Sequence, residues 1–210
     1  QPILSSPSEG LDTTGRAFFL RRILKMPDKQ TVRKCMGELR RKVGMNAHAG
    51  LLKMLSRALQ EERRVLTVGT YQPIGSEPDI NSELLRWSAA DGARALALPW
   101  CTDREASCME YRLWDPCEKL EADAAGIPGS RKGACVVPDV LLIPCLGWTR
   151  SRRRLGYGGG YFDRYISKLL ESGASPRLLG VAYGVNEVDD SLFEPHDLPL
   201  DLIITDSGIF

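Results

Sequence analysis

A run of four glycines within five positions, with a basic residue before it and an acid after it, is the stretch of this chain best suited to chemistry. It reads Arg-Leu-Gly-Tyr-Gly-Gly-Gly-Tyr-Phe-Asp-Arg over residues 154–164. Glycines let a backbone approach an anion closely and adopt positive φ angles. The N-terminus of a helix adds unpaired N–H groups and the positive end of the helix dipole. Where a helix follows the glycines, such a stretch is suited to binding a phosphate group.

The residues on either side predict the elements that must position this stretch. The apolar, β-branched run 136–143 predicts a buried strand before it. After it, apolar residues recur at helical spacing from Phe162 to Leu170, and Gly173 is expected to end that helix. The glycines are therefore predicted to lie in a loop between a strand and a helix N-terminus.

Two common phosphate-binding motifs do not fit this loop. A Walker A loop needs Gly-Lys-Ser/Thr after its spacer, and Tyr161 stands where the dinucleotide pattern needs its third glycine. For the glycines alone, a tight connection that packs a helix on a strand is the alternative interpretation. Arg154, Tyr161 and Asp163 in fixed register with the glycines are much more specific.

Length, charge and cysteine content limit the classes of function. A chain of 210 residues can form one α/β domain with a sizeable core, and a net charge of +1 gives no general attraction to nucleic acid or to an anionic membrane. No apolar run approaches the roughly 20 residues of a membrane-spanning helix. The six cysteines include no Cys-x-x-Cys pair, which favours reduced thiols in a cytoplasmic protein. With two histidines, a His-rich zinc site is not expected.

Predicted strands and helices alternate along the rest of the chain. Strands are expected at 65–71, 93–99, 108–114, 178–183 and 200–205, and helices at 28–43, 47–63 and 80–90. The second helix should bury Leu51, Leu55, Ala58 and Leu59. This pattern predicts a single α/β domain over residues 27–210, with a largely parallel sheet and helices on both faces. Residues 1–26 are expected to form a flexible N-terminal extension, and residues 115–133 an irregular rim loop.

The glycine-rich stretch resembles the Arg-Leu-Gly-x-Gly-x-Gly-Tyr-Tyr-Asp motif of the 5-formyltetrahydrofolate cyclo-ligases, also called methenyltetrahydrofolate synthetases. The resemblance extends from about Lys29 to about Thr205. It implies a three-layer, Rossmann-like fold. It also implies conversion of 5-formyltetrahydrofolate to 5,10-methenyltetrahydrofolate, driven by Mg²⁺ and ATP, with release of ADP and phosphate. In that chemistry the formyl oxygen attacks the γ-phosphorus, and N10 then closes on the activated carbon as phosphate leaves.

The resemblance also assigns residues to ATP. The family carries Lys-x-x-Leu-Arg near its N-terminus, which Lys29 and Arg33 match; without the resemblance this pair reads as a solvated basic face. Arg154 and Tyr161 are the implied catalytic residues. The implied ATP-binding residues are Lys29, Arg33, Arg154, Leu155, Gly156, Tyr157, Gly158, Gly159, Gly160, Tyr161 and Phe162.

A second set of residues is assigned to folate. The segment 71–79 fits the family's Tyr-x-Pro…Glu-x-Asp pattern, whose Glu holds the pterin, and Glu77 takes that place. Without the resemblance, Glu77 and Asp79 are interpreted as loop or capping residues. Met109, Tyr111 and Trp114, in the predicted strand 108–114, are then interpreted as core residues. The implied substrate-binding residues are Gln72, Glu77, Met109, Tyr111, Trp114, Tyr157, Gly160 and Tyr161.

By the same resemblance, Asp163 and Asp197 are the implied Mg²⁺ ligands; without it, Asp163 reads as a helix cap. The chain departs from the family where Thr149 replaces an Asp and Arg152 replaces a Gly. The expected partners are ATP and 5-formyltetrahydrofolate, with or without a polyglutamate tail, and a monomer is expected. Two alternatives remain open: a catalytically weakened member that binds RNA or nucleotides through the arginines of 150–154, and another small-molecule phosphotransferase.

Overall fold

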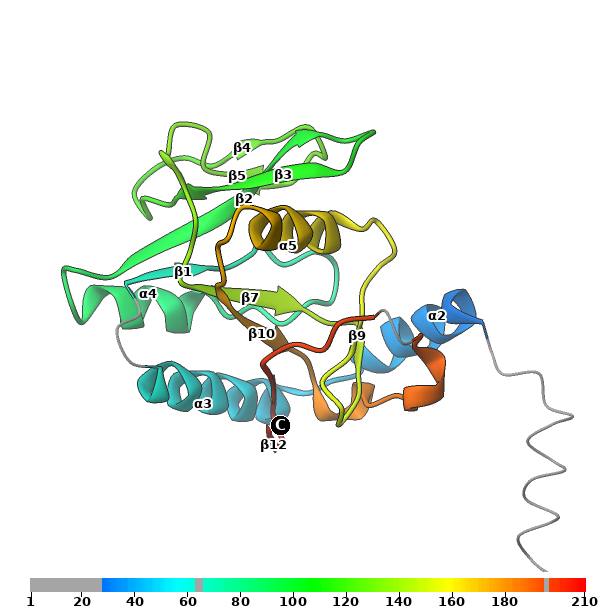
Figure 1. The fold of residues 1–210 in the computed structure, drawn as a ribbon. Helices are drawn as coiled ribbons and strands as arrows, with labels where there is room; N and C mark the ends of the chain where they lie inside the picture. Colours follow the sequence, from blue (N-terminus) through cyan, green and yellow to red (C-terminus); the bar gives the residue numbers. More distant parts are fainter. Residues whose placement is uncertain (1–27, 63–65, 195–196) are drawn as a thin grey trace, which may run out of the picture.

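The computed structural model describes residues 28–62, 66–194 and 197–210. The extension expected over residues 1–26 lies outside this part of the chain. Within the described part, a sheet of eight strands has the order β12-β11-β10-β7-β1-β2-β3-β6 (Figure 1). Its strands are β1 (Thr67–Gly69), β2 (Ala95–Asp103), β3 (Cys108–Leu113), β6 (Cys135–Val136), β7 (Val140–Pro144), β10 (Arg177–Val181), β11 (Leu202–Thr205) and β12 (Gly208–Ile209).

Helices and two small hairpins complete the described fold. The α-helices are α2 (Lys29–Arg40), α3 (Met45–Glu61), α4 (Asn81–Ala89) and α5 (Tyr161–Glu171), with 3-10 turns at Gly184–Asn186 and Asp190–Leu192. One hairpin pairs β4 (Glu121–Ala122) with β5 (Pro128–Gly129), and the other pairs β8 (Gly147–Trp148) with β9 (Arg154–Leu155). None of the helices described here combines the length and the apolar character needed to cross a lipid bilayer.

The strand order reverses between β1 and β7. Strands β11, β10, β7, β1 and β2 are parallel. At one edge β12 pairs antiparallel with β11; at the other β3 pairs antiparallel with β2, and β6 antiparallel with β3. From β1 the chain passes through α4 to β2 on one side, and it later returns to β7 on the other side of β1. In open α/β sheets the crevice at the carboxyl ends of the strands on either side of such a reversal is the usual ligand site.

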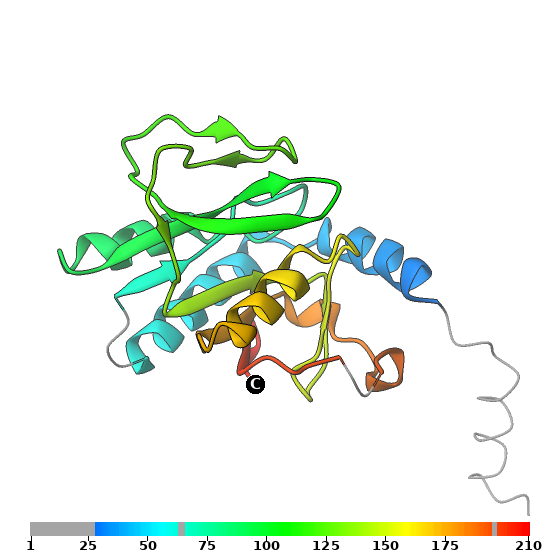
Figure 2. The ribbon, with the colours of Figure 1, turned by 45° about the horizontal axis from the view of Figure 1, so that its top comes forward.

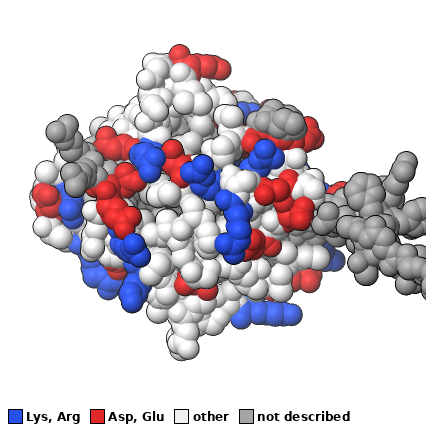
Figure 3. Space-filling model, turned by 60° about the horizontal axis from the view of Figure 1, so that its bottom comes forward, with Lys and Arg blue, Asp and Glu red and all other residues white. Residues whose placement is uncertain are grey.

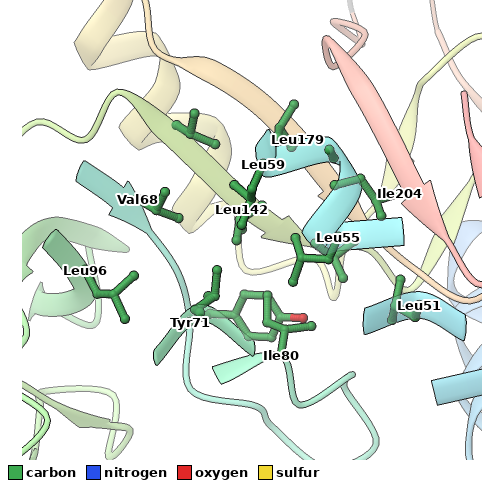
Figure 4. Packing of buried hydrophobic residues seen from close by; sticks show 14 of the residues in the cluster. Leu51, Leu55, Leu59, Val68, Tyr71, Ile80, Leu96, Leu142, Leu179 and Ile204 are labelled. Carbon is green, nitrogen blue, oxygen red and sulfur yellow. The ribbon is translucent and has the colours of Figure 1, made fainter. Parts of the chain in front are cut away.

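Helices cover both faces of this sheet, which confirms the predicted three-layer architecture. Helices α3 and α4 pack on one face and α5 on the other (Figures 1 and 2). The strands serve both cores because successive side chains point to opposite faces. In β7, Val140 and Leu142 pack toward α3, whereas Leu141 and Ile143 pack toward α5. Figure 4 shows Leu142 and Leu179 of the sheet among the leucines of α3.

Several local predictions are confirmed. The Asp28 side chain caps α2 by accepting the N–H of Thr31 at 2.8 Å. Helix α3 buries the four predicted residues, Leu51, Leu55, Ala58 and Leu59. Gly173 follows the end of α5 with φ of +82°, as expected for a glycine that ends a helix.

Other boundaries differ from the prediction. The expected strand at 136–143 is split into β6, which pairs with β3 at one edge of the sheet, and β7, which lies between β10 and β1. Pro138, which has no N–H to donate to a sheet, falls between them. Asp139, next to it, instead accepts the N–H groups of Leu66 and Thr67 at 2.9 and 2.8 Å. The first predicted helix ends at Arg40 rather than at Val43.

The β8–β9 hairpin lies between β7 and the glycines, and both departures from the family pattern fall in its turn. Thr149 is 1% exposed, and its hydroxyl accepts the N–H of Arg153 at 3.2 Å. This side-chain bond to the backbone stabilises the turn. Arg152 has φ of +65°, a left-handed conformation that favours the glycine of the family pattern. Both substitutions relative to the family pattern therefore lie in the turn of the hairpin that immediately precedes the glycine loop.

Gly69, at the end of β1, provides a test of the packing between strand and core. A Cβ atom at this position would lie 2.7 Å from Tyr111 Cε1, 2.8 Å from Leu141 Cδ2 and 2.9 Å from Pro138 Cγ. We expect Gly69→Ala to destabilise the protein by about 1–3 kcal/mol, because such overpacking forces its neighbours to move. Chemical denaturation would measure the loss. Gly92→Ala, where a Cβ has no neighbour within 4 Å, is the control and should be nearly neutral. Equal stability of the two variants would contradict this packing.

Candidate functional site

A cavity of about 360 Å³ lies at the carboxyl ends of the strands that flank the reversal. The loop after β1 forms one wall and the glycine loop, residues 156–160, forms another. Of the residues singled out in the sequence, the cavity is lined by Gln72, Glu77, Met109, Arg154, Gly156, Tyr157, Gly158, Gly159, Gly160, Tyr161, Phe162 and Asp163. Residues separated by about 90 positions in the chain therefore meet at one site.

The glycine loop has the geometry of an anion-binding loop. Gly160 is the N-cap of α5 with φ of +71°, and Gly158 has φ of +97°. No side chain of the described residues caps the N-terminus of α5, so its first N–H groups remain available to a ligand. The Nε of Arg33 in α2 donates to the carbonyl of Gly156 at 2.9 Å. Arg33 therefore holds the loop in place from the helix that also carries Lys29.

The expected phosphate-binding cations are paired with the expected metal-binding acids. Arg154 forms an ion pair with Asp163, and Lys29 Nζ lies 3.1 Å from Asp197 Oδ2. The Asp163 side chain is 74% exposed, and an ion pair with so exposed a partner contributes little to stability. The described residues contain no cluster of three or more His, Cys, Asp or Glu side chains placed to hold a metal.

Glu77 is a buried carboxylate at the opposite wall. It is 8% exposed, and its Oε2 accepts the N–H of Ile74 at 2.8 Å. Burial raises the pKa of the Glu77 carboxyl above its usual value, while the Ile74 hydrogen bond and the charge of Arg40 act in the opposite direction. Asp79, by contrast, accepts the N–H of Asn81 at 3.1 Å, a local bond in the turn before α4, whose N-cap is Ile80.

Six of the assigned residues do not line the cavity. Of these, Arg33 donates to the Gly156 carbonyl, and Lys29 and Asp197 pair with each other. The other three lie in or against the cores. Tyr111 is fully buried in the core on the α5 side, 5.3 Å from the ring of Tyr165, because Gly69 leaves room for its ring there. Trp114 packs against the other core, on the α3 side, and lines a separate cavity. Leu155 is buried. For these residues the structure favours the ordinary core interpretation.

Other residues of the cavity were not found from the sequence. Asp123, Ala125 and Ile127 reach it from the β4–β5 hairpin, within the segment expected to be a rim loop. The carboxylate of Asp123 accepts the N–H of Cys101 at 2.8 Å and so holds this hairpin on β2. Buried Arg40 of α2, which contacts Tyr157, was also missed. Its spacing from Lys29 and Arg33 on one helix face was a usable signal.

The arginines of 150–154 do not form a free basic surface. Arg150 makes a bidentate pair with Glu187 at 2.9 and 3.2 Å, and Arg152 donates to the Asp201 carbonyl at 3.0 Å. Arg154 pairs with Asp163 in the site. On the face that Figure 3 shows, basic and acidic side chains are interspersed. These observations do not favour the RNA-binding alternative.

All six cysteines are free thiols, and Cys101 and Cys145 are buried. Burial raises the pKa of the Cys145 thiol to about 11, which keeps it protonated at neutral pH. Cys101 lines the cavity, with its sulfur 3.9 Å from the Tyr161 hydroxyl. Tyr161 thus rests against β2 from the first turn of α5.

Comparison with known proteins gives the family. The sequence model of the 5-formyltetrahydrofolate cyclo-ligase family matches residues 25–206. The 5-formyltetrahydrofolate cyclo-ligase of Mycoplasma pneumoniae is 43% identical over 68 residues, which are 32% of this chain and 39% of that protein. The mitochondrial one of Arabidopsis thaliana is 27% identical over 148 residues, 62% of this chain and 53% of that protein. The chain thus spans about half or less of the length of these two relatives.

A solved structure shows the same fold. The 5,10-methenyltetrahydrofolate synthetase of Mycoplasma pneumoniae superposes with a TM-score of 0.68 at 22% identity, over 86% of this chain and 99% of that one. At this identity the superposition establishes the fold alone. The family match covers nearly the whole chain, including the glycine loop and the Glu77 loop. The chain belongs to the 5-formyltetrahydrofolate cyclo-ligase family.

Proposed function

We propose that this protein converts 5-formyltetrahydrofolate to 5,10-methenyltetrahydrofolate, using Mg-ATP and releasing ADP and phosphate. The observation that carries the proposal is that a single cavity has the glycine loop on one wall and the Glu77 carboxylate on another. A phosphate donor and a folate ring bound to these walls would meet within it. The family membership supports the same reaction.

The nucleotide is assigned to the glycine loop. The free N–H groups at the start of α5 and the left-handed glycines would cradle its phosphates. Lys29, Arg33 and Arg154 would offset their charge, with Arg as a planar fork and Lys as a point charge. We propose that phosphate displaces Asp163 from Arg154 and Asp197 from Lys29.

The residues present fit a magnesium ion. Asp163 lines the cavity, and Asp197 is paired with Lys29; the proposed exchange would free both carboxylates for the ion. Mg²⁺ prefers such oxygen ligands, together with phosphate oxygens and waters. When bound, the ion would neutralise charge on the β- and γ-phosphates.

The folate is assigned to the Glu77 wall. The buried carboxylate would accept N–H groups of the pterin in charge-assisted hydrogen bonds, beside Gln72 and the apolar surface of Met109. Tyr161, at the start of α5, would align the formyl oxygen with the γ-phosphorus. The formyl oxygen forms a bond to phosphorus as the bond to ADP breaks. N10 then attacks the activated carbon, and the oxygen leaves as part of phosphate. The chain contributes positioning and charge neutralisation.

The first prediction tests this reaction. Mixing the protein with Mg-ATP and 5-formyltetrahydrofolate should produce the absorbance of a methenyl-folate, with one phosphate released per product, and the rate should depend on Mg²⁺. Asp163→Asn and Asp197→Asn should weaken the use of Mg-ATP far more than folate binding. Wild-type kinetics of both variants at limiting Mg²⁺ would contradict the metal assignment. ATP turnover with other acceptors, and none with folate, would instead indicate a different phosphotransferase.

A second prediction concerns the glycine loop. Gly158→Ala would place a side chain in a left-handed conformation, at a cost of about 1–2 kcal/mol. The loop can relieve this strain by moving its N–H groups, so we expect nucleotide affinity to fall roughly tenfold by calorimetry. Gly173→Ala has the same backbone strain, with φ of +82° and open space, but lies at the far end of α5. This control should lose stability and keep wild-type nucleotide affinity. Wild-type ATP binding by Gly158→Ala would mean that the glycines form only a packing turn.

A third prediction separates stability from function at Glu77. Because burial raises the pKa of Glu77, the folded state disfavours its charged form, and stability is lost as pH rises from the ordinary value of 4.5 through the raised value. Glu77→Gln removes this charge and keeps an oxygen for the N–H of Ile74. We expect the variant to melt at a higher temperature than wild type at pH 7, with the difference vanishing near pH 4. Folate affinity should fall by about tenfold or more. A variant less stable at pH 7, or one that binds folate normally, would contradict this assignment.

A further inference from the structure

Arg40 connects the two walls of the cavity from behind. It is the last residue of α2 and is 3% exposed. Its Nε donates to the Ser76 hydroxyl at 3.1 Å, and its Nη2 donates to the Tyr157 hydroxyl. The guanidinium carbon also lies 5.3 Å from the centre of the Tyr157 ring. Ser76 immediately precedes Glu77 in the folate loop, and Tyr157 lies in the glycine loop, so one side chain holds both loops.

Holding two loops together with a buried arginine lowers the stability of the folded protein. Its Nη1 is buried without a hydrogen-bond partner among the described residues, and a buried donor of a charged group that lacks a partner is costly. Burial lowers the pKa of the Arg40 guanidinium, and the charge of Glu77 opposes that shift. A hydrophobic residue would anchor α2 without these penalties. The arrangement therefore points to a role beyond packing.

We propose that Arg40 is a positioning residue that couples the nucleotide loop to the folate loop, so that each substrate strengthens the binding of the other. This inference rests on the proposed function, because it requires that the two loops bind these two substrates. It concerns the cooperation between them rather than the identity of either.

The physical basis is the shared ordering of the two loops. Tyr157 is 52% exposed and is held by Arg40, so the position of its hydroxyl and that of Arg40 constrain each other. A nucleotide that fixes the glycine loop would fix Arg40 and, through Ser76, the Glu77 loop. The folate would then lose less conformational entropy when it binds. Thermodynamic linkage requires the same gain for the nucleotide when folate binds first.

The test is a ratio: the dissociation constant of 5-formyltetrahydrofolate without nucleotide, divided by its dissociation constant with nucleotide bound. Calorimetry would measure 5-formyltetrahydrofolate binding with and without a saturating, non-hydrolysable ATP analogue and Mg²⁺. We expect the analogue to tighten folate binding by at least about fivefold in the wild-type protein. In Arg40→Gln the ratio should fall close to one. The adjacent Arg41→Gln, which changes an exposed arginine of the same segment, is the matched control and should keep the wild-type ratio.

Two milder variants separate coupling from simple packing. Tyr157→Phe and Ser76→Ala each remove one hydroxyl that binds Arg40, and each should lower the ratio. Combining Tyr157→Phe with Arg40→Gln should lower it no further than Arg40→Gln alone. Should Arg40→Gln fail to fold, the two hydroxyl variants decide the test. A purely structural role would lower the melting temperature and leave the ratio unchanged.

The outcomes distinguish this inference from the proposed function. A wild-type ratio of one, or an unchanged ratio in the Arg40 and hydroxyl variants, would overturn the coupling while folate turnover remained intact. Failure of the wild-type protein to bind folate would overturn the proposed function, and the coupling with it.

Discussion

The reversal of strand order between β1 and β7 is the constraint on which the rest of the structure depends. Because adjacent parallel strands end at the same edge of a sheet, the chains leaving β1 and β7 must diverge there, and the crevice between them cannot be filled by a connecting helix. The loop after β1 carries Glu77, and the chain after β7 makes the β8–β9 hairpin before it reaches the glycines. The cavity is therefore a consequence of topology, and its chemistry comes from the two loops.

Ion pairs balance the charges of the basic side chains at and near this site. Cations placed to hold phosphates would repel one another if they stood alone. In this structure Arg154 and Lys29 each have an acidic partner, Asp163 and Asp197. Their partners are partly exposed, so water screens the pairs and keeps them weak. Weak pairs of this kind are compatible with the proposed exchange of Asp163 and Asp197 for phosphate.

The sequence predicted the layers and the glycine loop well, and the reasons are local. The buried face of α3, the Asp28 cap and the glycine before Tyr161 each depend on residues within a few positions of one another. The sequence did not indicate contacts between segments that are distant in the chain. Tyr111 enters the core because Gly69, on another strand, leaves space for its ring. Asp123 joins the cavity because a hairpin folds onto β2. Neither of these contacts can be predicted from the spacing of residues along the chain.

Arg40 and Glu77 show a further limit of local reasoning. An arginine near the end of an amphipathic helix normally lies in solvent, and a glutamate in a turn-rich loop normally does as well. Here the end of α2 packs against both loops, and the two charges are buried near each other without a direct ion pair among the contacts of the described residues. Burying two charges without a direct ion pair reduces the stability of the folded protein. Their burial beside a cavity is therefore better explained by binding than by folding, since an apolar pair would serve folding alone at lower cost.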